Sequence, residues 1–173
     1  MPRMWKAKVP GDASYSTCTR YRWWLTRELG GKRPLVAIGL NPSKATEEWD
    51  DPTVAKEQLF AKLWGFDRYI KLNAYGWRET KPKIMFAAQK RGVDIVGADN
   101  DRQIRLAVLA AKKKGGRVFV SWGENIEPER QQALYDLVSP IMPMWCTRTN
   151  KSGSPKHSLY EPNESTLQEW HAP

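Results

Sequence analysis

Short apolar runs alternate with longer amphipathic stretches along most of this 173-residue chain. The clearest run, Leu35–Leu40, contains only apolar residues and one glycine, which is typical of a strand buried on both faces of a sheet. Comparable runs predict strands over Arg20–Thr26, Tyr69–Asn73, Arg117–Trp122 and Ile141–Thr147. A turn at Gly30-Gly31 separates the first two strands, so we expect them to pair as a hairpin.

Helical periodicity fills the segments between these strands. Asp51-Pro52 indicates a helix start, because an N-cap carboxylate precedes a proline, and the predicted helix runs from Thr53 to Trp64 before Gly65. Further helices are expected over residues 82–91, 99–114 and 127–138, and in a short final segment capped by Asn163. Alternating strands and helices predict one α/β domain over residues 1–173, with a mostly parallel sheet and an irregular arm over residues 1–17.

Polar residues stand at or beyond the ends of four predicted strands. They are Asn41, Asn73, the Ser121–Gly123 step and the loop that leads to His157. Because the carboxyl ends of parallel strands meet at one edge of a sheet, we expect a ligand site there. The turn Gly39–Pro42 combines a glycine that lets a ligand approach the backbone with a proline that fixes a sharp exit. An ordinary turn is the alternative, since Asn-Pro is a common turn pair.

The charge balance favours a polyanionic partner. The chain has 28 Lys and Arg residues against 19 Asp and Glu residues, a net charge of +9, which is typical of small domains that bind nucleic acid. Most of the nine tryptophans are expected in the core, with one or two in loops placed to stack on bases. No apolar stretch approaches the ~20 residues of a membrane span, and no secretory signal is evident, so we expect a cytoplasmic protein.

Few residues are suited to hold a metal or a cluster. Cys18 and Cys146 fit a reducing compartment and are too few for an iron–sulfur cluster or a four-cysteine zinc site. His157 and His171 do not cluster with them in the sequence. The sequence therefore predicts neither a metal site nor a cofactor.

Four segments resemble motifs of the uracil-DNA glycosylase superfamily, in that superfamily's chain order. Gly39–Pro42 is similar to the first motif of the mismatch-specific branch, and Leu72–Ala74 to the strand end that presents a base-reading Asn. Val120–Gly123 resembles the next strand end, and Pro155–Leu159 resembles the second catalytic motif, a His-containing loop that grips DNA. The resemblance implies a three-layer α/β sandwich around a mostly parallel four-stranded central sheet.

A closer resemblance covers nearly the whole chain. A bacterial and phage family catalogued as domain of unknown function 1643 is similar to the segments GLNPSKATEEWDDPT, RYIKLNAYGWRETKP, VGADND, SWG and PKHSLYEP. The name of that family conveys no activity. Functional expectations therefore come from the superfamily motifs.

The superfamily resemblance implies a site that cleaves a flipped base from DNA. In such a site Asn41 orients the attacking water, Asn73 binds the base edge, and His157 donates to the leaving base or grips its phosphate. The further base-binding positions are Gly39, Leu40, Pro42, Ser43, and Trp49 or Tyr75 in place of a stacking Phe. The implied DNA-binding positions are Arg148, Lys151, Gly153, Ser154, Lys156 and Ser158, with Leu159 or Tyr160 as a wedge.

The chain departs from the uracil-specific branch at Asn41, where that branch has an Asp. Because an amide is not a general base, we consider Asp50 as a carboxylate that faces the site, and Asp51 as the cap of the following helix. Ser43 stands where a Tyr blocks thymine in that branch, which predicts a pocket wider than one for uracil.

Three functions remain open at this point. The first is a monomeric DNA glycosylase-like hydrolase that flips and excises a uracil-like or modified base. The second is a non-catalytic module of the same fold that binds DNA or a base, which the missing Asp favours. The third is an enzyme of phage DNA base modification that acts on free nucleotides. Steeply salt-dependent DNA binding separates the first two from the third, and base release separates the first from the second.

The basic loop, residues 148–157, gives a first testable prediction. Lys151→Ala combined with Lys156→Ala should lower the affinity for all DNA sequences alike and flatten its salt dependence, because phosphate contacts carry no sequence information. Titration of labelled oligonucleotides at several salt concentrations measures both effects. An unchanged affinity and an unchanged slope would remove this loop from the DNA interface.

Overall fold

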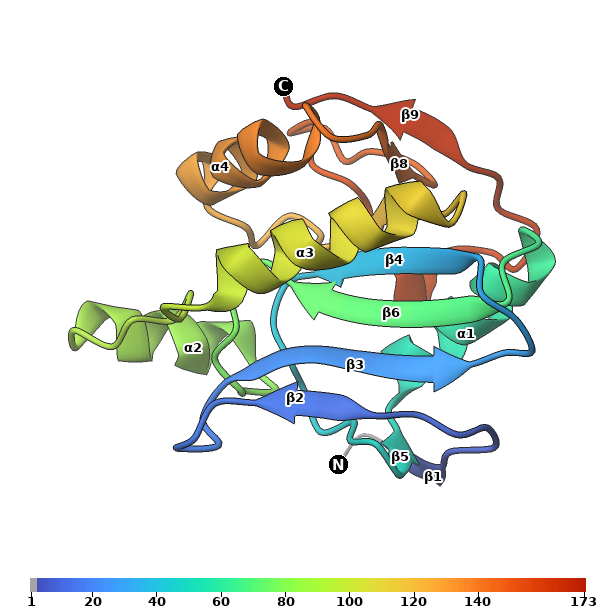
Figure 1. Cartoon of the computed structure of the whole chain (residues 1–173). Helices are drawn as coiled ribbons and strands as arrows, with labels where there is room; N and C mark the ends of the chain where they lie inside the picture. Colours follow the sequence, from blue (N-terminus) through green and yellow to red (C-terminus); the bar gives the residue numbers. More distant parts are fainter. Residues whose placement is uncertain (1–2) are drawn as a thin grey trace.

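The computed structural model describes residues 3–173, which form an α/β fold around one large sheet (Figure 1). Its strands are β1 (Trp5–Lys6), β2 (Ala13–Tyr15), β3 (Arg22–Glu28), β4 (Pro34–Gly39), β5 (Trp49–Asp50), β6 (Arg68–Asn73), β7 (Arg117–Val120), β8 (Met144–Cys146) and β9 (Gln168–Trp170). Its helices are α1 (Pro52–Leu63), α2 (Pro82–Lys90), α3 (Asn100–Lys113), α4 (Pro128–Val138) and the short 3₁₀ helix η1 (Ser158–Tyr160). Within the described residues, no helix has the length and apolar character needed to cross a membrane.

The large sheet is mixed, with parallel pairs at its centre and antiparallel pairs at its edges. Within residues 3–173 it has seven strands in the order β2-β3-β6-β4-β7-β8-β9, and β1 pairs separately with β5. The neighbours β6, β4, β7 and β8 run parallel, whereas β2, β3 and β9 join antiparallel. This corrects the expectation of a mostly parallel sheet of four strands, because three of the six neighbouring pairs are antiparallel.

The central strand β4 contributes to an apolar cluster on each face of the sheet. Val36 and Ile38 pack with residues of α3 and α4, whereas Leu35 and Ala37 pack with residues of α1. Figure 1 shows α3 in front of the sheet and α1 behind it. All six residues of β4 are buried, as a parallel strand covered on both faces requires.

Helix α1 has the bounds that its capping residues predict, within one residue at each end. The Val54 backbone N–H donates to Asp51 Oδ1 at 2.8 Å, and Pro52 occupies the first turn. Beyond the last turn, Gly65 has a φ of +79°, a conformation that glycine adopts without strain.

Three expectations about the fold are wrong. β3 and β4 do not form a hairpin, because β6 lies between them and pairs with both. Residues 168–170 form strand β9 rather than a final helix, and Trp170 packs edge-on against Trp122. The arm over residues 1–17 contains β1 and β2, and its residues 1 and 2 lie outside the described residues. In the first two cases the decisive partner is distant in the sequence, so the local pattern did not reveal it.

A buried ion pair ties β3 to the segment before α1. Arg27 Nε and Nη2 donate to Asp50 Oδ1 at 2.9 and 2.7 Å, and Gln58 Nε2 donates to Asp50 Oδ2 at 2.9 Å. The remaining guanidinium N–H groups reach backbone carbonyls, among them those of Thr26 and Thr46. Each guanidinium nitrogen and each carboxylate oxygen therefore has a hydrogen-bond partner, which a buried charge pair needs in order not to destabilise the fold.

Arg27→Met should strongly destabilise the protein, because it leaves the Asp50 carboxylate buried without its cation. We expect a loss of about 3–5 kcal/mol in the free energy of unfolding, measured by urea denaturation. Adding Asp50→Asn to this variant should recover part of the loss. The matched control is Arg68→Met, which removes a partly exposed pair with Glu28 and should cost less than about 1 kcal/mol. Equal losses of unfolding free energy in Arg27→Met and Arg68→Met would contradict the stabilising role of the buried pair.

Candidate functional site

A cavity of about 680 Å³ opens at the carboxyl ends of β4, β6 and β7. The first turn of α1 and the segment from residue 150 to residue 160 complete its wall. This is the sheet edge at which the strand-end residues were expected to meet. The predicted site residues that line the cavity are Gly39, Leu40, Asn41, Ser43, Asn73, Lys156, His157, Leu159 and Tyr160.

Three residues predicted to bind the base or to act in catalysis do not line the cavity. The Asp50 carboxylate is bound to Arg27 and Gln58 and does not line the cavity. Trp49 lies in β5 with 45% of its surface exposed, and Tyr75 is fully buried in the core. Asp51 lines the cavity while it caps α1, so it replaces Asp50 as the carboxylate that faces the site.

Several residues of the predicted DNA-binding loop have structural partners instead. Arg148 forms a bidentate pair with Glu161 at 2.9 and 2.8 Å. The buried Ser158 hydroxyl donates to Glu57 Oε1 at 2.7 Å, and the Ser154 side chain is buried within the loop. The remaining predicted positions outside the cavity lining are Pro42, Lys151 and Gly153.

A fully buried carboxylate, that of Glu57, lies at this edge of the sheet, and it was not identified from the sequence. It is fully buried on α1 and forms an ion pair with Lys71 Nζ at 2.8 Å. Tyr69 and Ser121 also donate to it through their hydroxyls, at 2.6 and 2.9 Å, as does Ser158. Burial alone would raise the pKa of Glu57, but the Lys71 ammonium and these donors hold it below its usual value. The carboxylate is therefore ionised in the folded protein.

Lys71 reaches the cavity because Gly39 leaves room for its ammonium group. A Cβ at position 39 would lie 2.5 Å from Lys71 Nζ and 3.3 Å from Asn73 Oδ1, and the first of these distances is a clash. The sequence did carry a signal for Lys71, since residues two apart in a strand point to the same face. The prediction of Asn73 as a site residue therefore implied Lys71 beside it.

Asn73 presents an unused amide to the cavity. Its side chain is 1% exposed, and neither Nδ2 nor Oδ1 has a hydrogen-bond partner among residues 3–173. Its backbone carbonyl, in contrast, accepts a hydrogen bond from the buried Asn100 amide at 3.0 Å. A buried donor and a buried acceptor without partners are costly, so this side chain is a candidate for direct ligand contact.

Arg22 brings a second buried cation to the cavity. The side chain is buried in the cavity wall, and its Nη1 donates to the Ala45 carbonyl at 2.7 Å. Its Nε has no hydrogen-bond partner within the described residues. Burial lowers the pKa of Arg22, and the Asp51 carboxylate acts in the opposite direction. Arg22 and Asp51 therefore interact electrostatically at the wall of the cavity.

His157 lines the cavity as a neutral imidazole. Burial and the Lys71 ammonium lower the pKa of His157, while the Glu57 and Asp51 carboxylates partly counteract them. His157 Nδ1 accepts a hydrogen bond from the Leu159 backbone N–H at 3.3 Å. The proton of this neutral ring therefore resides on Nε2, which makes Nε2–H a hydrogen-bond donor.

Asn41 is anchored at the mouth of the cavity. Its Nδ2 donates to the backbone carbonyl of Glu79, and the Pro42 carbonyl accepts from the Glu79 N–H at 3.0 Å. The turn after β4 is thus bound to the segment after β6. Within residues 3–173 there is no group of three or more His, Cys, Asp or Glu side chains suited to hold a metal ion.

Comparison with known proteins gives one match. The family model described as protein of unknown function (DUF1643) matches residues 22–159, which include every residue of the cavity lining except Tyr160. Searches of curated proteins and of solved structures found no match.

The lowered pKa of His157 predicts a pH dependence of stability. The unfolded imidazole, with a pKa of about 6.5, takes up its proton before the folded one does. The free energy of unfolding should therefore fall as the pH decreases through about 6.5 towards the pKa of the folded state. Urea denaturation between pH 7.5 and pH 5.5, the range that brackets this pKa of roughly 6.5, measures the effect.

His157→Gln should remove this part of the pH dependence. The matched control is His171→Gln, because the His171 side chain is exposed and does not line the cavity. A pH dependence that is the same in wild type and in His157→Gln would show that His157 titrates alike in the folded and unfolded states.

Proposed function

The chain belongs to the DUF1643 family, whose description names no activity, and we propose that it excises a uracil-like or modified base from DNA. The proposal rests on the Asn73 amide, which is buried in the cavity wall with its donor and its acceptor both unpartnered. The edge of a nucleobase offers donors and acceptors side by side, and a flipped base is recognised through that edge. A base in the cavity would satisfy both atoms of the amide.

The partner in this proposal is DNA, bound by a monomeric cytoplasmic protein. The motif order shared with the uracil-DNA glycosylase superfamily supports it, as does the net charge of +9. We also propose a common architecture, a three-layer sandwich in which α1 covers one face of the central strands and α3 and α4 cover the other. The assignment of the two helical layers is supported by the two apolar clusters of β4.

Cleavage requires a water molecule that attacks C1′ of the nucleotide. In the proposed mechanism Asn41 orients this water, with its amide nitrogen held by Glu79. Asp51, which replaces Asp50 in this role, accepts the proton that the water loses as its oxygen bonds to C1′. The bond from C1′ to the base nitrogen breaks, and its electron pair leaves with the base.

The departing base carries a negative charge that two groups are placed to stabilise. Lys71 lines the cavity as a cation, because the ionised Glu57 holds its ammonium at 2.8 Å. His157 supplies an Nε2–H donor, as its neutral tautomer requires. Fixed donors and charges in a cavity that excludes water stabilise a developing anion more than they would in bulk water.

The cavity mouth offers side chains to fill the gap that a flipped base leaves in the DNA. Tyr160 is 81% exposed and lies at the cavity beside Leu159. Exposed apolar or aromatic groups that enter a base stack keep the base extruded. Lys156 lines the same side of the cavity and would hold a neighbouring phosphate.

A non-catalytic reader of DNA or of a base is the second candidate. It is favoured by Asn41, which stands where the uracil-specific branch has a carboxylate. Such a reader would use Asn73 and the basic residues as above, without base release. An enzyme of phage DNA base modification would use the same cavity for a free nucleotide.

A base-release assay tests the proposal. Labelled oligonucleotides, single- and double-stranded, would carry uracil, a thymine mismatch, hypoxanthine or 5-hydroxymethyluracil. Release that disappears in Asn41→Ala and falls about 10²–10⁴-fold in Asp51→Asn would establish the glycosylase and its catalytic acceptor. Salt-sensitive binding without release would favour the reader, and absence of both would favour the enzyme that acts on free nucleotides.

Asn73→Ala should lower base release about 100-fold, because the base loses two hydrogen bonds in a buried site. Binding of undamaged DNA should stay near the wild-type value, since phosphate contacts carry it. The matched control is Asn163→Ala, an exposed asparagine outside the cavity lining. Thermal unfolding verifies that each variant folds. Unchanged discrimination between bases in Asn73→Ala would exclude Asn73 from base recognition.

A further inference from the structure

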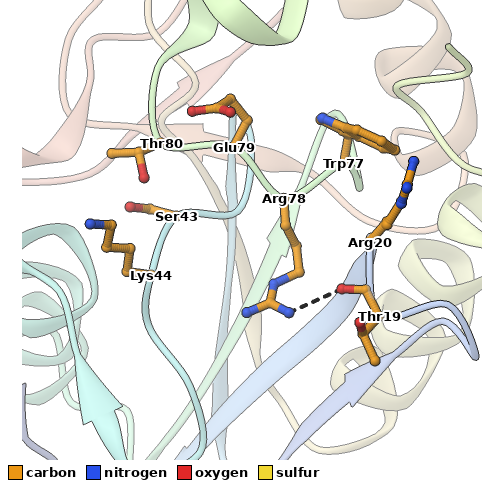
Figure 2. A pocket seen from close by; sticks show the side chains of 8 residues that line it. All are labelled: Thr19, Arg20, Ser43, Lys44, Trp77, Arg78, Glu79 and Thr80. Carbon is orange, nitrogen blue, oxygen red and sulfur yellow. Dashed lines mark hydrogen bonds between the residues drawn. The ribbon is translucent and has the colours of Figure 1, made fainter. Parts of the chain in front are cut away.

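A second hollow of about 460 Å³ adjoins the cavity on the side of β3 (Figure 2). We call it the arginine groove and define it by its lining residues, which are Thr19, Arg20, Ser43, Lys44, Trp77, Arg78, Glu79 and Thr80. Ser43 and Thr80 line both hollows. A ligand that occupies the cavity can therefore extend into the groove without leaving the surface.

Two arginines of the groove are held in place without being neutralised. Arg78 Nη1 donates to the Thr19 carbonyl at 3.0 Å, and its guanidinium lies 4.8 Å from the Tyr15 ring centroid. The Arg20 guanidinium lies 5.7 Å from the Trp77 ring centroid. Figure 2 shows the two side chains next to each other. Within residues 3–173 neither arginine takes part in an ion pair. Both positive charges therefore remain available to an anionic ligand.

The groove as a whole is positively charged. Lys44 is a third cation in its wall, and Glu79 supplies the acidic side chain of the lining. The Glu79 carboxylate accepts a hydrogen bond from the Lys81 backbone N–H at 3.0 Å. Guanidinium groups match phosphate oxygens in geometry and charge, so the preferred ligand is a phosphate-bearing one.

The arginine groove and the basic loop lie on opposite sides of the cavity. Groove residues come from the segments before β3, after β4 and after β6, whereas Lys156 follows β8. In the strand order β3-β6-β4-β7-β8 the groove segments adjoin β3, β6 and β4. The loop with Lys156 lies beyond them at the end of β7, where the Gly123 N–H donates to the Pro155 carbonyl at 3.0 Å.

We propose that the arginine groove binds the sugar-phosphate backbone next to the flipped nucleotide, on the side away from Lys156. The inference rests on the proposed function in so far as it takes nucleic acid as the partner. Arg20 and Arg78 hydrogen-bond to phosphate oxygens of the flanking nucleotides. A base in the cavity is thereby held by its own strand on both sides.

Binding of labelled oligonucleotides by Arg20→Gln with Arg78→Gln tests the groove, because these are the two residues proposed to contact phosphates. Two lost phosphate contacts should flatten the slope of log affinity against log salt by about 2 and lower the affinity roughly tenfold or more. The matched control is Lys112→Gln with Lys113→Gln, which removes the same charge from two exposed lysines at the C-terminal end of α3. Thermal unfolding verifies that the double variant folds, because Arg78 also donates to the Thr19 carbonyl. If it does not fold, Arg20→Gln alone keeps the test decisive and should flatten the slope by about 1.

A mononucleotide, dUMP, distinguishes the groove from the cavity. The groove variants should bind dUMP as wild type does, because one nucleotide occupies the cavity without reaching the flanking phosphates. Equal losses for dUMP and for oligonucleotides would overturn the proposal and assign the groove to the nucleotide pocket. Groove variants that bind oligonucleotides as the lysine control does would also overturn it.

The same experiment separates this inference from the proposed function. Suppose that wild type binds oligonucleotides, that the groove variants lose this binding, and that no base is released. The proposed role of the groove is then supported, and the proposed glycosylase activity is rejected. If base is released while the groove variants bind as wild type does, the glycosylase stands and the groove fails. Wild-type protein that binds no oligonucleotide would overturn both.

Discussion

The buried carboxylate of Glu57 is the interaction on which the cavity depends. It connects α1 to β6 through Tyr69 and Lys71, to the end of β7 through Ser121, and to η1 through Ser158. Burial of an ionised carboxylate without these donors would cost too much free energy. The folded arrangement of α1, β6, β7 and η1 therefore depends on all of these hydrogen bonds. The segment that carries His157 is thereby fixed to the sheet that carries Asn73.

Two adjacent carboxylates have different tasks because their surroundings differ. Asp50 is enclosed by Arg27 and Gln58, so it stabilises the junction between β3 and α1. Asp51 uses one oxygen to cap α1 and also lines the cavity beside the buried Arg22. In the proposed mechanism the second position thus supplies the base that the Asn41 amide is unable to provide.

Local chemistry made part of this structure predictable. The Asp51-Pro52 start of α1 and the strand ends at Asn41 and Asn73 follow from capping and from apolar runs, and the structure brings them to one edge. Glu57 could not be assigned, because a glutamate inside an amphipathic helix looks the same whether it faces solvent or a buried lysine. The predictions of a hairpin and of a final helix were wrong for a related reason. β3 pairs with β6 and β9 pairs with β8, and both partners are distant in the sequence.

The cavity lining has two parts. Lys71 lies on a central strand, where Gly39 leaves room for its ammonium group, and other lining side chains lie on loops. The Lys71 charge is held by the ion pair with Glu57 of α1. Lining side chains from loops, such as Ser43 and Thr80, take no part in this ion pair. An exchange of such loop residues can therefore change which ligand the cavity accepts without removing the Lys71–Glu57 ion pair.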